Sequence, residues 1–347
     1  MAGAGDATTV ASPGGASARA SSDAGADGRT TRSHTARSHT ARPRTARPRG
    51  GRRTGRGYPL FLVPGAVLFT AVIAVPFGMN VWISFNRWQG IGPMTWVGLE
   101  NYRRLFADSV FWSSFWHNVL LVIAMALVPT ALGLVVAAAL FDFVGKRFGA
   151  RTASVLRACF YLPQVMPLAV MGVVWGWILA PDSGVLNSAL RDVGLSSLAH
   201  DWLGDPKTAL YSIMGVMVWI QLGFPLVVFM AGLQRIDPAL YEAAELDGAS
   251  WRHRLWHVTV PQIRPEFYVV LLMCTIAALK AFAPIYVLTR GGPGVSTDIP
   301  SYFSYQNFFE KTQVGYGAAT ATVLAVITLV ITAGFIFMQF RHQDEEG

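Results

Sequence analysis

Six long apolar runs dominate this chain, and they restrict it to a small set of folds. The runs are residues 59–85, 117–141, 155–180, 209–233, 267–289 and 316–340. Each is long enough to cross a bilayer core of about 30 Å, for which a helix needs roughly 20 residues. Because lipid offers the backbone no hydrogen-bond partners, spanning segments of this kind fold as helices. The pattern predicts an all-α membrane protein with six transmembrane helices.

The distribution of basic residues predicts which side of the membrane each connection faces. Connections on the cytoplasmic side carry an excess of Lys and Arg, and eleven of the 28 Lys and Arg lie in residues 1–57. Without that segment the two sets of connections are nearly balanced, so the segment decides the orientation. The pattern predicts a multi-pass protein of the cell membrane with both termini, residues 1–57 and 341–347, in the cytoplasm.

Residues 1–57 are rich in Ala, Gly, Ser, Thr, Arg and Pro. A segment of this composition cannot bury a core, so it is predicted to be a disordered basic tail. The net charge of +8 is mainly a property of this tail. Its predicted partners are anionic membrane lipids rather than nucleic acid. The membrane domain is expected to span residues 58–340.

A polar and ionisable stretch, residues 237–265, separates the fourth and fifth apolar runs. It reads DPALYEAAELDGASWRHRLWHVTVPQIRP, in a chain where charged residues make up only 14% of the total. A stretch with so many charges does not suit lipid. The orientation above places this connection in the cytoplasm.

The residues of this stretch predict two helices joined by a tight turn. Asp237 can cap the first helix, and the fixed φ of Pro238 suits the first helical position. Gly248 can end that helix, because glycine takes the left-handed conformation at little cost. Ser250 can cap a second, short helix, which is expected to end before Pro261. On its own, such a stretch also fits a solvated connector between spans.

The same stretch resembles the EAA loop of the permeases of binding-protein-dependent ABC importers. That loop has the pattern Glu-Ala-Ala, two variable residues, Asp-Gly-Ala, and a proline further along. The matching residues are Glu242, Ala243, Ala244, Asp247, Gly248, Ala249 and Pro261. The resemblance implies that this EAA loop, residues 237–265, docks in a cleft on a separate ATPase. Glu242 would then meet a basic group, and the two alanines would allow close approach.

Three further stretches extend the resemblance to the carbohydrate-uptake branch of the family. They are residues 97–102 (VGLENY), 175–187 and 288–293 (LTRGGP). They are similar in particular to the first permease of the maltose or glycerol-3-phosphate type pair. The resemblance therefore covers about residues 59–340 and leaves the tails unmatched.

The chain lacks a Gly-rich loop followed by Lys and Ser or Thr, so it has no phosphate-binding site of its own for ATP. The resemblance implies the missing parts: two copies of a cytoplasmic ATPase, a second, similar permease and an external solute-binding protein. It implies a transport subunit rather than an enzyme, with no cofactor. Such a subunit moves a sugar or oligosaccharide by alternating access between two states.

An ionisable side chain within an apolar run is costly in lipid, which makes Lys280 a candidate for the transport path. It lies nine residues before Thr289, or about 13 Å along a helix, so its ammonium does not easily reach the outer surface. A path lysine would bind sugar hydroxyls or an anionic substrate; a snorkelling lysine is the alternative. Phe282 and Tyr286 follow at helical spacing and suit either the path or ordinary packing.

The WIQLGFP segment of the fourth run gives a second set of path candidates. Gln221, Gly223 and Phe224 lie beside Pro225, which is expected to disrupt the helix and free backbone carbonyls. Aromatic faces and amides suit sugars, because the former stack on C–H surfaces while the latter bind hydroxyls. The resemblance implies that the corresponding parts of these two spans form the substrate path.

Other readings of the chain remain open. His253 and His257 have i, i+4 spacing, but no third ligand is in register, so no metal site is expected. Ser, His and Asp residues occur, but the sequence contains no motif of a catalytic nucleophile, so no catalysis is predicted. Within the family, the solute could be glycerol-3-phosphate, a glycerophosphodiester or a polyol. Outside it, the chain could be a self-contained channel or secondary carrier, in which residues 237–265 would only connect two spans.

Overall fold

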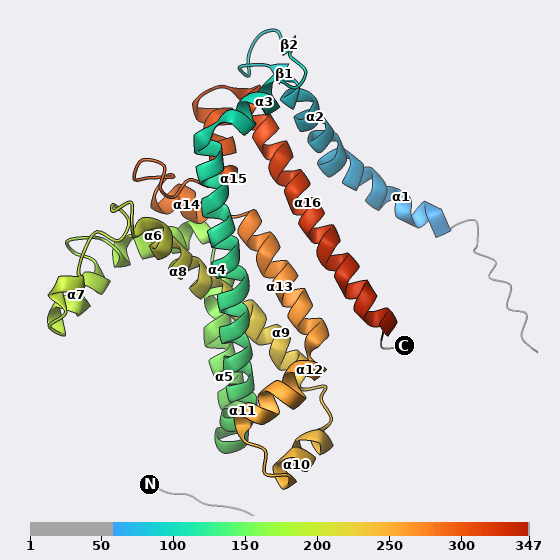
Figure 1. The fold of residues 1–347 in the computed structure, drawn as a ribbon, viewed down its shortest axis with the longest axis vertical. Coiled ribbons are helices and arrows are strands. Elements are labelled where there is room, and N and C mark those ends of the chain that lie inside the picture. The colour runs from blue at the N-terminus through green and yellow to red at the C-terminus, as the bar shows by residue number, and fades with distance from the viewer. Residues whose placement is uncertain (1–57, 346–347) are drawn as a thin grey trace, which may run out of the picture. The chain divides into compact units, whose positions relative to one another are not determined.

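The computed structural model describes residues 58–345, so the predicted basic tail lies outside the described residues. The described chain is almost entirely helical (Figure 1). Its α-helices are α1 (Tyr58–Phe69), α2 (Val75–Ser84), α3 (Glu100–Ala107), α4 (Ser109–Ala139), α5 (Gly145–Val165), α6 (Leu168–Ile178), α7 (Val185–Asp192), α8 (Ala209–Gln221), α9 (Gly223–Leu233), α10 (Pro238–Leu246), α11 (Trp251–Arg254), α12 (Val260–Gln262), α13 (Arg264–Leu279), α14 (Ala283–Leu288), α15 (Pro300–Tyr305) and α16 (Val314–Glu345).

Short segments join these helices. Five are π- or 3-10-helical turns: η1 (Thr70–Ala74), η2 (Leu140–Val144), η3 (Ser196–Leu198), η4 (Leu255–Thr259) and η5 (Gln306–Glu310). The two strands, β1 (Asn86–Arg87) and β2 (Thr95–Trp96), pair antiparallel in a small hairpin between α2 and α3. The fold therefore depends on helix packing.

Four helical segments are long and apolar enough to cross a membrane unaided. They are Phe61–Ser84, Ser109–Phe143, Ala209–Leu233 and Val314–Met338. Two further pairs qualify only if each bent pair counts as one span: Arg151–Val165 with Leu168–Ile178, and Trp251–Gln262 with Arg264–Leu279. The described residues thus provide four to six candidate spans, by length and composition alone.

The third apolar run, expected as one span from 155 to 180, is broken in the middle. α5 and α6 meet at an angle of 99°. Pro167, with φ −57° and ψ 130°, precedes α6 and lacks the N–H that a continuous helix would use. The residue before a proline also avoids the α conformation, so the chain turns at this point.

The fifth run, expected as one span from 267 to 289, is also broken. α13 ends at Leu279, and Phe282 has the non-helical pair φ −146°, ψ −58° before α14 begins at Ala283. Lys280 therefore lies at the end of a helix, not within a continuous one. In the fourth run the helix is interrupted only at Leu222, three residues before Pro225, and Leu222 keeps helical angles. The effect of Pro225 is thus smaller than expected.

α4 is the central packing element. It lies beside α13, α9 and α8 (Figure 1). α9 approaches it closely, because a Cβ on Gly133 of α4 would come within 2.6 Å of Pro225. A cluster of buried apolar side chains fills the space between α4, α9, α13 and the EAA loop, including Leu226, Phe229 and Val270. This cluster fixes the two ends of the EAA loop to the same core.

α1, α2 and α16 present large apolar surfaces. In the most apolar window of Phe61–Ser84 no residue is buried, and in that of Val314–Met338 only 6% are. α2 packs along α16 (Figure 1), yet Met79 of α2 and Val330 of α16 remain more than half exposed. Surfaces of this kind need lipid or another helix to cover them.

Candidate functional site

The first half of the EAA loop has the local structure that its sequence predicts. The carboxylate of Asp237 accepts a hydrogen bond from the Ala239 N–H at 2.9 Å, and Pro238 is the first residue of α10. Gly248 has φ +73°, the left-handed conformation that favours glycine. Ser250 accepts a hydrogen bond from the His253 N–H at 3.4 Å and caps α11.

The second helix of the loop is longer than predicted. It does not end before Pro261 but continues through η4 and α12 to Gln262. The Val260 N–H donates to the carbonyl of Leu255, a five-residue step. This wider turn lets Pro261, which has no N–H, remain in the helix. The chain then bends by 79° into α13.

Polar contacts hold the two helices of the loop together. The Tyr241 hydroxyl lies 3.0 Å from Thr259 Oγ1, and Arg254 pairs with Glu245. Burial raises the pKa of Tyr241, which keeps its hydroxyl protonated. These contacts make the loop one folded unit.

Two contacts attach the loop to the spans. Arg235, just before the loop, pairs with Glu266, just after it, and the Glu266 side chain is only 10% exposed. Trp251 donates from Nε1 to Asp142 Oδ2 at 3.1 Å, which joins the loop to the end of α4 through η2. The loop is therefore connected to α4, α9 and α13 by direct contacts.

A hollow of about 490 Å³ lies at the turn between the two loop helices. It is lined by Ala244, Asp247, Gly248, Ala249, Ser250, His253, His257 and Val258. Four of the seven EAA residues thus meet at one concave surface. Glu242 and Ala243 are exposed on α10 outside the hollow, and Pro261 is exposed on α12. A small and partly apolar hollow beside exposed charges suits a protein partner.

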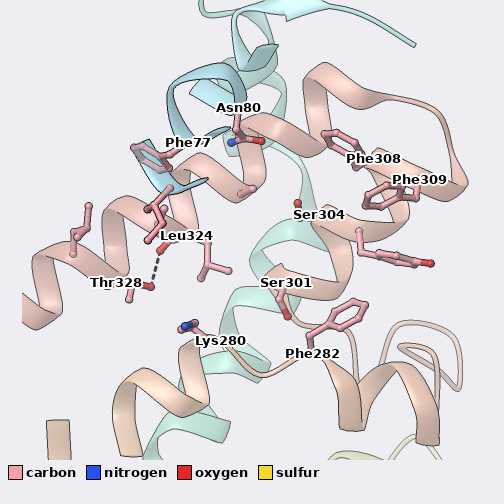
Figure 2. Close-up of a pocket in the computed structure, with 15 residues that line it drawn as sticks. Phe77, Asn80, Lys280, Phe282, Ser301, Ser304, Phe308, Phe309, Leu324 and Thr328 are labelled. Atoms are coloured by element: carbon pink, nitrogen blue, oxygen red, sulfur yellow. Dashed lines mark hydrogen bonds between the residues drawn. The ribbon is translucent and has the colours of Figure 1, made fainter. Parts of the chain in front are cut away.

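A large cavity lies where α13 ends. This main cavity has a volume of about 930 Å³ and is lined by Ile73, Phe77, Asn80, Lys280, Phe282, Ser301, Ser304, Tyr305, Phe308, Phe309, Ala321, Leu324, Ala325, Thr328 and Leu329. Figure 2 shows Lys280 projecting from the end of its helix into the space that Ser301 and Thr328 also face. Aromatic rings with a few polar groups suit a sugar-sized ligand.

A second cavity, of about 270 Å³, adjoins the main cavity. Lys280 and Phe282 line both, and Gln221 lines only the second. Gln221 donates from Nε2 to Cys274 Sγ at 3.5 Å. Tyr286 lines neither cavity, but its ring stacks on Phe282 with centroids 5.4 Å apart. The structure thus brings together four of the six predicted path residues.

The other two predicted path residues lie in helix packing. A Cβ on Gly223 would come within 2.7 Å of Tyr161 Cα and 2.8 Å of the Phe160 carbonyl. The missing side chain therefore allows α9 to approach α5. Phe224 packs against the apolar cluster between α4, α9 and α13. Neither residue lines the main or the second cavity.

Comparison with known proteins identifies the family. Residues 130–342 match the family of the binding-protein-dependent transport system inner membrane component. The chain belongs to this family.

Individual relatives agree. The chain is 36% identical over 274 residues to a probable ABC transporter permease protein of Bacillus subtilis, YurN, covering 79% of this chain and 92% of that protein. It is 32% identical to the sulfoquinovosyl glycerol transport system permease protein SmoG of Agrobacterium fabrum, covering 80% of this chain and 88% of that protein. The protein is therefore a permease, a transport component of the membrane rather than an enzyme.

A solved structure shares the fold of this permease. It is the bacterial alginate ABC transporter in complex with an alginate pentasaccharide-bound periplasmic protein. The matched chain has a TM-score of 0.71 and 23% identity, covering 82% of this permease and 95% of that chain.

Several residues around these sites were not predicted from the sequence of the permease. Asn80, Ser304 and Thr328 lie on α2, α15 and α16, far from Lys280 in the chain, and no motif marks them. For His253 and His257 the sequence predicts no metal site and no other role. In the structure their rings stack, with centroids 4.0 Å apart, on the wall of the loop hollow. Their i, i+4 spacing was the available signal.

Proposed function

We propose that this permease translocates a sugar or oligosaccharide and is driven by a separate ATPase that docks on the EAA loop. The observation that carries the proposal is the loop itself: two capped helices around a hollow, fastened internally and attached to α4, α9 and α13. A unit built in this way can move as a rigid body and transmit its displacement to the spans. SmoG is named as a sulfoquinovosyl glycerol permease, and the solved structure with the same fold is an alginate transporter. Both names support a sugar as the solute.

The proposed topology has six spans, of which the third contains α5 and α6 and the fifth runs from residue 267 to 289 through α13 and α14. It places the EAA loop, residues 237–265, and both termini in the cytoplasm. The excess of basic residues in residues 1–57 supports this orientation. The proposed tail therefore contacts anionic lipid, and the membrane domain extends over residues 58–340. α16 continues as a helix to Glu345.

The proposed assembly contains a second, similar permease, two ATPase copies and an external solute-binding protein. The apolar surfaces of α1, α2 and α16 support a neighbouring permease. The main cavity, with Lys280, Phe282 and Tyr305, is the proposed segment of the sugar path. Closure of the ATPases moves the loop and changes the side to which this path opens. Membership of the family argues against a self-contained channel or carrier.

Charge reversal on the loop tests the proposal. Glu242→Lys is expected to abolish co-purification of the ATPase from the native host and ATP-dependent sugar uptake, because it places a cation where the partner supplies one. Asp192→Lys, an equivalent change at the exposed end of α7, is the matched control and should preserve both. If Glu242→Lys retains ATPase and uptake at the level of the control, the loop is not the docking site.

A further inference from the structure

Lys280 differs from the other polar residues that line the main cavity, because its side-chain hydrogen-bond donors have no partner within the described chain. Asn80 uses Nδ2 to donate to the Ala318 carbonyl at 3.2 Å and to Thr322 Oγ1 at 3.0 Å. The hydroxyls of Ser304 and Thr328 donate to backbone carbonyls of α16 at 2.9 and 2.8 Å. The donors of these side chains are therefore already occupied.

The remaining hydroxyls that line the cavity are also engaged. Ser301 donates to the Ala281 carbonyl, and Tyr305 is hydrogen-bonded to Tyr286. Among the described lining residues, only the Lys280 ammonium keeps its three N–H donors for a ligand. The free oxygen of Asn80 and the lone pairs of the hydroxyls are acceptors, which suit the hydroxyl hydrogens of a sugar.

The charge of Lys280 is not balanced by a nearby carboxylate. Among the described residues that line the main and second cavities, there is no Asp or Glu. Within the part of the chain that the structure describes, Lys280 lies at the C-terminal end of α13, where its backbone N–H donates to the Ile276 carbonyl. A helix terminus supplies about half an elementary charge, less than an ammonium requires. The Lys280 side chain is exposed in the described chain, so its ammonium is accessible to a ligand.

We infer that the transported sugar carries an anionic group, a carboxylate, sulfonate or phosphate, and that this group pairs with Lys280 while the aromatic rings hold the sugar. Such a group only accepts hydrogen bonds and therefore complements three free donors. Lys280 lines both cavities, so the anion stays paired as the sugar passes from one to the other. The inference rests on the proposed function, because it takes the main cavity as part of the sugar path.

The reactivity of Lys280 toward an amine-acetylating reagent tests this inference. The full chain, purified with its co-purifying partners, is acetylated in the presence of trigalacturonate or of its methyl ester, which has the same sugar rings without the charges. Acetylation of each lysine is followed by mass spectrometry. Lys207, exposed and outside both cavities, is the internal control.

Trigalacturonate is expected to protect Lys280 at a concentration about tenfold or more below that of the methyl ester, since a charged hydrogen bond is lost in the ester. Lys207 should react equally in all samples. Equilibrium binding to variants extends the test: Lys280→Arg should keep the preference for the acid, and Lys280→Met should abolish it. Equal protection by the two probes, no protection by either, or a preference that survives in Lys280→Met overturns the inference.

The outcome is independent of the test of the proposed function. If the ATPase is lost in Glu242→Lys but Lys280 shows no preference for the acid, the permease assignment stands and the anionic substrate is wrong. If the preference for the acid is present but the ATPase survives Glu242→Lys, the proposed docking site is wrong and the cavity still selects anions.

Discussion

The EAA loop and the main cavity differ in how far along the chain their contacts reach. Within the loop, Tyr241 bonds to Thr259, 18 positions away, and Arg254 pairs with Glu245, 9 positions away. At the cavity, Asn80 of α2 bonds to Ala318 of α16, 238 positions away. The loop is a local unit, whereas the cavity exists only when both ends of the membrane domain are assembled.

This difference decides what a mutation in each region reports. A change in the loop can alter docking while the spans stay folded, so its effect appears in coupling. A change near the cavity acts on packing and on the ligand together. Each of the following predictions therefore pairs a substitution with the same substitution at a control position elsewhere in the chain.

Gly248→Val should have the largest effect, a loss of uptake to background. The left-handed φ of +73° at Gly248 costs a residue with a Cβ about 1–2 kcal/mol, so the turn of the loop changes shape. Gly194→Val is the matched control, because Gly194 has φ +81° and is equally free of steric contacts. Uptake assays should show normal transport in the control. Equal losses in the two variants would mean that the loop has no special role.

Gly223→Ala should lower the stability of the domain without changing its preference among solutes. The added Cβ meets the backbone of Tyr161 at 2.7 Å, and overpacking of this kind costs about 1–3 kcal/mol. Gly215→Ala on α8, where nothing lies within 4 Å, should be neutral or slightly stabilising. Thermal unfolding in detergent measures both. If Gly223→Ala has an unchanged midpoint of thermal unfolding but an altered solute preference, Gly223 belongs to the substrate path and the prediction is wrong.

The smallest predicted effect is on the pH dependence of stability and concerns Asp298. This residue lies just before α15, which lines the main cavity. Burial raises the pKa of its carboxyl to about 7, and His117 donates to its backbone carbonyl at 2.9 Å. The folded state therefore holds a proton that the unfolded state releases near pH 4. By linkage, stability falls as the pH rises from about 4 to about 7.

The variant Asp298→Asn should remove this pH dependence from the thermal midpoint measured between pH 5 and 8. Asp192→Asn, at an exposed carboxylate on α7, should leave it unchanged. If the thermal midpoint of Asp298→Asn depends on pH as that of the parent does, another group causes the pH dependence and the prediction is wrong.

The same difference in contact range explains what could be predicted from the sequence. The caps at Asp237 and Ser250 and the turn at Gly248 depend on neighbouring residues, so local rules found them. The end of the second helix was misplaced, because the π-helical turn before Pro261 accommodates a residue that usually ends a helix. The apolar runs overlap the four to six candidate spans. They did not predict the breaks at Pro167 and Lys280, because hydropathy carries no information about backbone angles.

The cavity could be predicted only in part. Lys280 was recognised because a charge in an apolar run is costly, and Phe282 because it follows at short spacing. The remaining walls come from α2, α15 and α16, and their approach to α13 depends on packing that no local pattern encodes. Gly223 was placed in the path for its position beside Pro225, whereas its missing Cβ serves the contact with α5.

The hydrogen bond between Trp251 and Asp142 has a consequence for the evolution of this protein. It joins the EAA loop to a segment 109 positions earlier, so neither residue can change freely. A replacement at 251 without an indole N–H leaves the acceptor at 142 without this donor, and a replacement at 142 does the reverse. Among homologous permeases, we expect the residues at these two positions to change together, and an alignment in which they vary independently would contradict this expectation.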